Sequence, residues 1–141
     1  MILFIGVIAI SIGAIVLADN LRKAEIENPS EYASQDDVPR LTAEEAYQAV
    51  QNDGAVLLDT RSAASFQAQR ATGAINIPVN ELEGRLNELD PDTWYITYCT
   101  WPAEETSARA AFILLQNGFT KSNPVLGGLQ AWVDDGFPIT Q

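Results

Sequence analysis

Short apolar segments that alternate with helical segments constrain the fold of this chain most strongly. Residues 55–58, 75–77 and 94–98 are apolar runs that are too short for helices, and turn residues border each of them. An uninterrupted apolar run is typical of a strand that is buried on both faces, as in a parallel sheet. We therefore predict an α/β domain in which helices flank both faces of a central, mostly parallel sheet of about five short strands.

Helix signals fill the intervals between these strands. The run Thr42-Ala43-Glu44-Glu45 has the pattern of a capping box and predicts a helix that ends at Asp53-Gly54. Further helices are expected over residues 62–69, 81–89 with Asn80 as the cap, 107–116 and 129–133, with a last strand at 125–126. These segments lie within residues 39–141, a length that suits one domain.

The first eighteen residues constrain where the chain resides. Residues 1–18 carry no charged side chain, and as a helix they would extend about 27 Å, near the lower limit for crossing a bilayer. We predict a single-pass transmembrane anchor and leave the side of the membrane open. A cleaved signal peptide is the alternative, because residues 16–18 resemble a small-residue cleavage site. Residues 19–38 are polar and acidic and predict a flexible tether.

Composition excludes several kinds of site. The chain has one cysteine and no histidine, which rules out an intramolecular disulfide, a Cys/His zinc site and a Cys-His catalytic couple. The formal net charge of −11, without a cluster of Lys or Arg, argues against a nucleic-acid partner. A cysteine nucleophile in this chain would therefore be activated by dipoles, backbone donors or basic side chains.

Cys99 is the candidate nucleophile. It follows the apolar run 94–98 and precedes the start of a predicted helix, where backbone N–H groups stabilise a thiolate. In open α/β sheets ligands bind beyond the carboxyl ends of the strands, and Asp59 and Arg61 also lie at such an end. Two roles are open for this pair: lining the site, or binding each other. Arg109 either reaches the loop after Cys99 or is an ordinary surface arginine.

Several motifs together resemble a single-domain rhodanese over residues 39–140. The matching segments are Leu57-Leu58-Asp59-Thr60-Arg61, Gly73-Ala74-Ile75-Asn76-Ile77-Pro78, Tyr98-Cys99 and Gly127-Gly128-Leu129-Gln130-Ala131-Trp132, together with Phe66. The resemblance implies a sulfurtransferase in which Cys99 forms a persulfide. It also implies that backbone N–H groups of the following loop point at the sulfur, without a metal or organic cofactor. That loop comprises Thr100, Trp101, Pro102, Ala103, Glu104, Glu105 and Thr106.

The loop resembles a rhodanese subgroup with the pattern Cys-x-Cys-Pro-x-Glu-x-x-Ser-Ala-Arg, some members of which are attached to membrane segments. Trp101 stands where that subgroup often has a second cysteine. Dual-specificity phosphatases and arsenate reductases carry an arginine six positions after the cysteine, whereas this chain has Glu105, preceded by Glu104. Two carboxylates oppose a dianion, which argues against a phosphatase.

The resemblance implies a sulfur donor such as thiosulfate, mercaptopyruvate or polysulfide, and a thiol acceptor. Because thiosulfate is itself a dianion, a neutral donor or a protein persulfide is an alternative. The competing hypothesis for the whole domain is a non-catalytic binding module of the same fold that docks a partner protein at the membrane.

Overall fold

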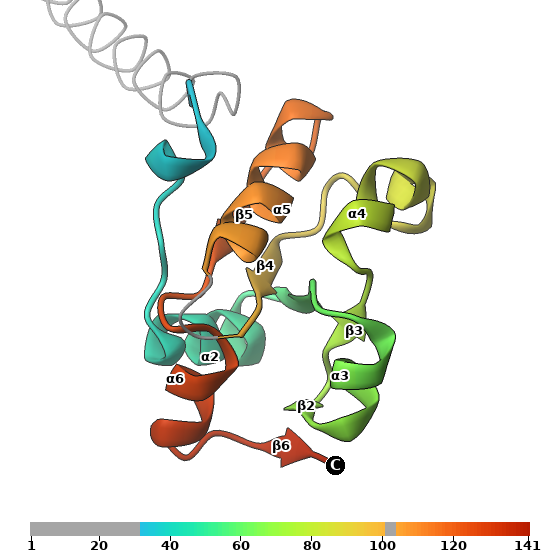
Figure 1. Cartoon of the computed structure of the whole chain (residues 1–141). Helices are drawn as coiled ribbons and strands as arrows, with labels where there is room; N and C mark the ends of the chain where they lie inside the picture. The colour runs from blue at the N-terminus through green and yellow to red at the C-terminus, as the bar shows by residue number, and fades with distance from the viewer. Residues whose placement is uncertain (1–31, 101–103) are drawn as a thin grey trace, which may run out of the picture.

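The computed structural model describes residues 32–100 and 104–141 (Figure 1). The predicted membrane segment 1–18 and loop residues 101–103 lie outside this part of the chain. Among the described residues, no helix is both long enough and apolar enough to cross a membrane. The membrane anchor therefore stays a prediction.

The described residues form a central sheet of four parallel strands in the order β3-β1-β4-β5. Leu41 adds an isolated parallel bridge to Val125 at the β5 side. A separate antiparallel pair joins two short strands, one in the middle of the chain and one near its C-terminus. The strands are β1 (Val56–Asp59), β2 (Arg70–Ala71), β3 (Ile75–Asn76), β4 (Tyr95–Tyr98), β5 (Ser122–Pro124) and β6 (Ile139–Thr140). The predicted parallel sheet is confirmed, with four strands and one bridge in place of about five strands.

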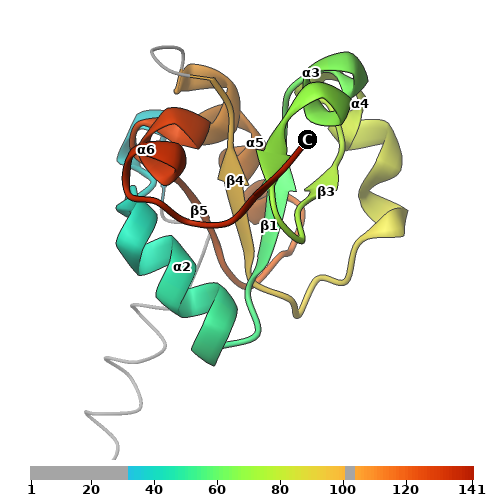
Figure 2. The same ribbon diagram turned by 90° about the horizontal axis from the view of Figure 1, so that it is seen from below.

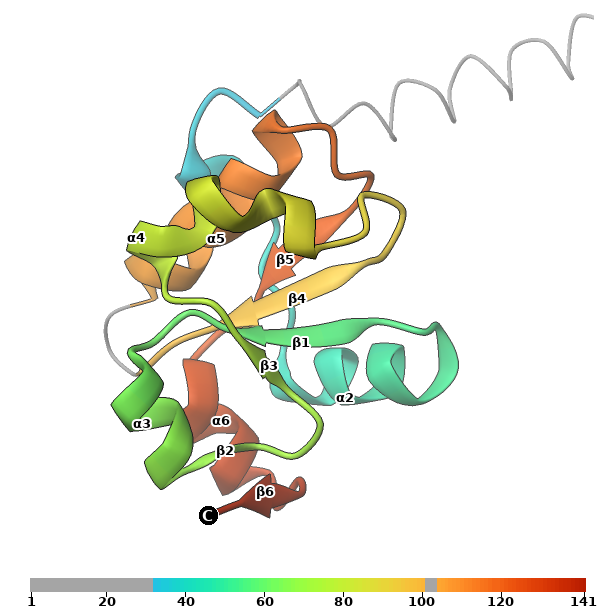
Figure 3. The same cartoon turned by 90° about the vertical axis from the view of Figure 1, so that its right-hand side faces the viewer.

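Helices cover both faces of this sheet, as the two-sided apolar strands predict (Figures 2 and 3). One face packs on α4 and α5, where Leu58 and Tyr95 join the apolar side chains of α5. The other face packs on α2 and α6, where Leu57 and Ile96 lie among the alanines of α2. The helices are α2 (Ala43–Asn52), α3 (Ala63–Ala68), α4 (Val79–Leu82), α5 (Glu105–Gln116) and α6 (Gly128–Asp134), with 3-10 helices η2 (Gln35–Asp37) and η3 (Glu83–Glu88).

The capping signals are confirmed for the first long helix. The Thr42 side chain accepts the N–H of Glu45 (3.1 Å), and the Glu45 carboxylate accepts the N–H of Thr42 (2.8 Å). This reciprocal pair satisfies two N–H groups that a helix start otherwise leaves without partners. Asp53 then caps the C-terminus as the sequence predicts.

Two elements differ from the sequence-based expectation. The last strand of the central sheet lies at residues 122–124 rather than 125–126. The sequence Ser-Asn-Pro of this strand lacks the apolar run that predicted the other strands, and the Ser122 hydroxyl donates to the Tyr95 carbonyl (2.8 Å). The helix expected over 81–89 begins at residue 79 after Pro78, and Asn80 does not cap it. From Glu83 it continues as a 3-10 helix. The change coincides with Gly84, and glycine weakens an α-helix.

The start of the folded part also needs correction. Residues 32–38 belong to the segment expected to be a flexible tether, yet Ser34 caps η2 and Val38 is 1% exposed. Val38 packs with Ala111 and Leu115 of α5, and the partly buried Tyr32 joins this cluster. Burial of these apolar side chains holds the segment on the domain, so the expected boundary near residue 39 lies too far along the chain.

The turn between β5 and α6 touches the end of β4. Gly127 and Gly128 have φ values of +78° and +56°, a region that disfavours residues with a side chain. A Cβ on Gly128 would lie 2.3 Å from the carbonyl oxygen of Cys99, and the next N–H, of Leu129, donates to that oxygen at 2.9 Å. This close approach fixes the peptide of Cys99, and only glycine permits it.

We expect Gly128→Ala to destabilise the protein by more than about 2 kcal/mol, because backbone strain adds to the clash with Cys99. Gly136→Ala is the matched control: Gly136 also has a positive φ (+77°), but a Cβ there meets no atom within 4 Å. Urea unfolding of both variants measures the difference. Equal losses of stability would contradict the role of the close contact.

Candidate active site

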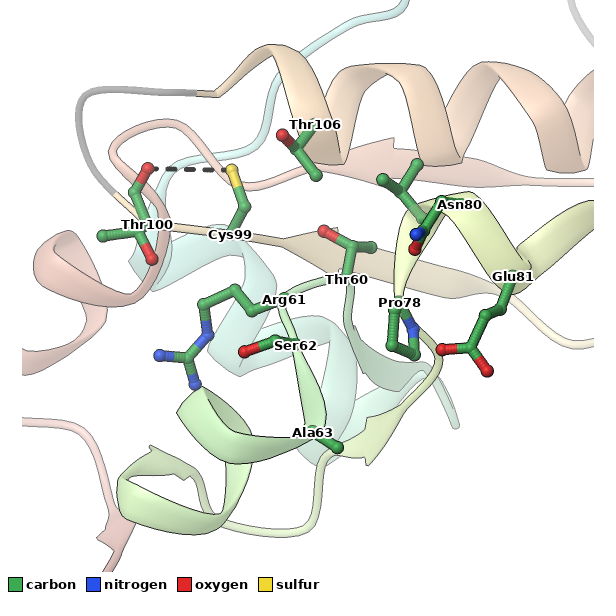
Figure 4. Close-up of a pocket in the computed structure, with 11 residues that line it drawn as sticks. Thr60, Arg61, Ser62, Ala63, Pro78, Asn80, Glu81, Cys99, Thr100 and Thr106 are labelled. Atoms are coloured by element: carbon green, nitrogen blue, oxygen red, sulfur yellow. Dashed lines mark hydrogen bonds between the residues drawn. The ribbon is translucent and has the colours of Figure 1, made fainter.

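Cys99 lies immediately after β4, at one wall of an open pocket of about 490 Å³ (Figure 4). Three chain segments that follow parallel strands meet there, as expected for the carboxyl edge of such a sheet. They are residues 60–63 after β1, residues 78–81 after β3, and Cys99, Thr100 and Thr106. The volume is in the range of small-molecule sites.

A hydrogen-bond chain surrounds the thiol, which is on a residue only 2% exposed. The thiol donates to Ser107 Oγ (3.3 Å) and more weakly to the Thr100 carbonyl (3.8 Å). Ser107 Oγ in turn donates to the Glu104 carbonyl (2.9 Å), and Thr97 Oγ1 donates to the Ser107 carbonyl (2.7 Å). Ser107 was not predicted as a site residue, although it is the serine of the loop pattern quoted above.

The electrostatics favour the protonated thiol. Burial raises the pKa of Cys99, and the charges of Glu104 and Asp59 raise it further. Hydrogen bonds from the side chain and backbone of Ser107 lower this pKa, but they do not outweigh the burial. Among the described residues, the hydrogen bonds from Ser107, in the first turn of α5, therefore offset only part of the cost of ionising the buried thiol.

Asp59 and Arg61 form a buried ion pair beside the pocket. Asp59 is 0% exposed, and its Oδ2 lies 2.6 Å from Arg61 Nη2. Arg61 Nε also donates to both carboxylate oxygens (3.0 and 3.1 Å), and Nη2 donates to the Gln69 carbonyl (2.6 Å). Burial lowers the pKa of Arg61, but Asp59 and Tyr98 together raise it above its ordinary value, so the guanidinium stays charged.

This geometry decides between the two roles left open for the pair. Asp59 binds Arg61 and does not line the pocket, whereas Arg61 does both. Within residues 32–100 and 104–141, Arg61 is the only basic residue that lines the pocket, and its charge is matched by Asp59. The sheet register explains their place, because Asp59 pairs with Tyr98 next to Cys99.

The remaining predicted residues separate into three groups. Thr100 and Thr106 line the pocket, and the Glu104 carboxylate accepts the N–H of Gly127 at 2.7 Å. Glu105 is exposed at the first position of α5, and Arg109 is exposed further along the helix, so neither lines the pocket. Trp101, Pro102 and Ala103 lie outside the described residues.

Sequence reasoning missed several polar residues that line the pocket. Ser62 follows β1 directly after Arg61, whereas Asn80 and Glu81 follow β3 and lie on the wall opposite Cys99 (Figure 4). The strand-end rule that selected Asp59 and Arg61 applies equally to the segment after β3. Applied to each strand in turn, it would have found these side chains.

Comparison with known proteins supplies the family. Residues 42–135 match the family model of the rhodanese-like domain. Thiosulfate sulfurtransferase GlpE of Glaesserella parasuis is 31% identical over 99 residues, which cover 70% of this chain and 90% of that protein. The adenylyltransferase and sulfurtransferase MOCS3-1 of Zea mays is 34% identical over 112 residues, but the match spans only 23% of its length.

Solved structures agree with this assignment. The crystal structure of a rhodanese-related protein from Thermoplasma volcanium superposes with a TM-score of 0.64 at 28% identity, and the match covers 72% of this chain and 96% of that one. The resemblance first drawn from scattered motifs is thus confirmed over the domain as a whole. The chain belongs to the rhodanese-like domain family.

Proposed function

We propose that this protein is a sulfurtransferase that carries sulfane sulfur as a persulfide on Cys99 and passes it to a thiol acceptor. The observation that carries the proposal is the position of Cys99: at the carboxyl edge of the sheet, at the wall of a small-molecule-sized pocket, with a hydroxyl 3.3 Å from its sulfur. Relatives named sulfurtransferases support the same chemistry.

The proposed reaction has two displacements on sulfur. Cys99 first loses its proton to solvent, and the thiolate attacks the outer sulfur of the donor. A bond forms between Cys99 Sγ and that sulfur while the donor's own bond to it breaks, and the donor leaves with the electron pair. An acceptor thiolate then attacks the outer sulfur of the persulfide, which releases the Cys99 thiolate. No electron is gained or lost overall, so the reaction needs no redox cofactor.

Mass spectrometry tests the first displacement. After incubation of the full-length chain with thiosulfate, mercaptopyruvate or polysulfide, we expect one added sulfur atom on Cys99 with at least one donor, removable by a thiol. Cys99→Ser is expected to abolish the adduct and the turnover, because the chain has no other thiol.

Two outcomes would contradict the proposal. Equal sulfur-transfer rates in the wild type and in Cys99→Ser would show that Cys99 is not the carrier. Absence of an adduct with every donor would favour the non-catalytic binding module, a hypothesis that the burial of Cys99 and the pKa raised by this burial support. Persulfidation of Cys99 would exclude that alternative.

The Ser107 hydroxyl gives a second prediction. Rotated away from the Glu104 carbonyl, it can donate to the sulfur anion, so Ser107→Ala removes a hydrogen bond to a charged group and raises the Cys99 pKa further. We expect the rate of alkylation by iodoacetamide at neutral pH to fall about tenfold and its pH profile to move to higher pH.

Ser122→Ala is the matched control for this variant. It also removes a buried serine hydroxyl. This hydroxyl donates to the carbonyl of Tyr95 (2.8 Å) in β4, the strand that leads to Cys99. It is expected to lower stability without moving the pH profile. A profile that moves equally in both variants would sink the specific role of Ser107.

We also propose that residues 1–18 anchor the domain in a membrane, on the basis of their uncharged, apolar sequence. The full-length chain is expected to stay with membranes after alkaline carbonate extraction, whereas a chain that begins at residue 19 is expected to be released. An intact mass lacking the first eighteen residues would support a cleaved signal peptide instead. Complete release of the uncleaved chain would refute the anchor.

A further inference from the structure

Glu104 is held in place beside Cys99 at two points. Its carboxylate accepts the N–H of Gly127 at 2.7 Å, and its carbonyl accepts the Ser107 hydroxyl at 2.9 Å. The same hydroxyl lies 3.3 Å from the Cys99 sulfur. Gly128, the next residue of the turn that holds the carboxylate, lies against the Cys99 carbonyl, so the charge of Glu104 is fixed close to the residue that carries the sulfur and raises the pKa of Cys99.

The other charges near the pocket do not cancel this carboxylate. Arg61 is the only cation that lines the pocket among the described residues, and the buried Asp59 already neutralises it. Glu81 lines the opposite wall, and its partner Arg85 (3.5 Å) is shared with Glu88. The described wall thus offers no unmatched positive charge to a dianion.

We propose that Glu104 is a specificity-determining residue that makes the site discriminate against dianionic sulfur donors, so that the pocket takes small organic persulfides, R–S–SH, in preference to thiosulfate. The inference rests on the proposed sulfur-carrier function of Cys99. A persulfide brings at most one negative charge to the pocket, whereas thiosulfate brings two. The repulsion from a fixed carboxylate is correspondingly larger for thiosulfate.

Both loading reactions balance without a further reagent. With an organic persulfide, the Cys99 thiolate bonds to the outer sulfur and the S–S bond of R–S–SH breaks. The R–S⁻ group leaves with the electron pair and takes up a proton. With thiosulfate, the same attack releases sulfite, which carries two negative charges. The leaving group in the second case is therefore a dianion, which departs from a pocket lined by Glu81.

The test compares loading rates for the two donors. The full-length wild type, Glu104→Gln and Glu104→Ala are each mixed with thiosulfate or with hydroxyethyl persulfide, and the second-order rate constant for persulfidation of Cys99 is measured by mass spectrometry. Glu104→Gln removes the charge but keeps an oxygen that accepts the Gly127 N–H. Glu44→Gln, at an exposed position on α2, removes the same charge elsewhere.

We expect the ratio of the thiosulfate rate to the persulfide rate to rise on the order of tenfold in Glu104→Gln at low ionic strength, and the effect to shrink in high salt. The ratio corrects for any change in the Cys99 pKa that affects both donors. Glu44→Gln is expected to leave the ratio unchanged. Glu104→Ala loses the bond to Gly127 as well, so both of its rates are expected to fall below those of Glu104→Gln.

The outcomes separate this inference from the function on which it rests. An unchanged ratio in Glu104→Gln, with Cys99 still persulfidated, overturns the role of Glu104 and leaves the carrier function standing. Faster loading of the wild type by thiosulfate than by the organic persulfide also overturns the role of Glu104 and leaves the carrier function standing. Failure of both donors to modify Cys99 overturns the carrier function and this inference together.

Discussion

The candidate active site depends on the contact between the Gly127-Gly128 turn and Cys99. Gly128 lies against the Cys99 carbonyl, Leu129 donates to that carbonyl, and Gly127 donates to the Glu104 carboxylate. Three successive residues of one turn thus hold Cys99 and Glu104. Because this turn also begins α6, the helix that packs on α2, the positions of Cys99 and Glu104 are tied to the core of the domain.

Much of the fold could be predicted from the sequence because its signals are local. The two-sided apolar runs, the Thr42 capping box and the glycine-containing ends of helices each reflect the chemistry of a few neighbouring residues. The last strand was misplaced for the same reason. Ser122 and Asn123 form strand bonds with β4 at the sheet edge, and no apolar periodicity accompanies them.

The site was predictable only in part, because its remaining features arise from contacts between distant segments. The strand-end rule placed Asp59 and Arg61 near Cys99, but whether they line the pocket or bind each other depends on side-chain geometry. The Glu104 carboxylate was expected only to oppose a dianion, and its bond to Gly127 joins residues 23 positions apart. Ser107 was overlooked because a serine in a helix start is ordinary without knowledge of the sulfur 3.3 Å away.

The packing of residues 32–38 on α5 gives this helix two separate contacts. Val38 packs with Ala111 and Leu115, in the later turns of α5, whereas Ser107, in the first turn, lies 3.3 Å from the Cys99 sulfur. One rigid element therefore joins the N-terminal end of the described domain to the candidate active site.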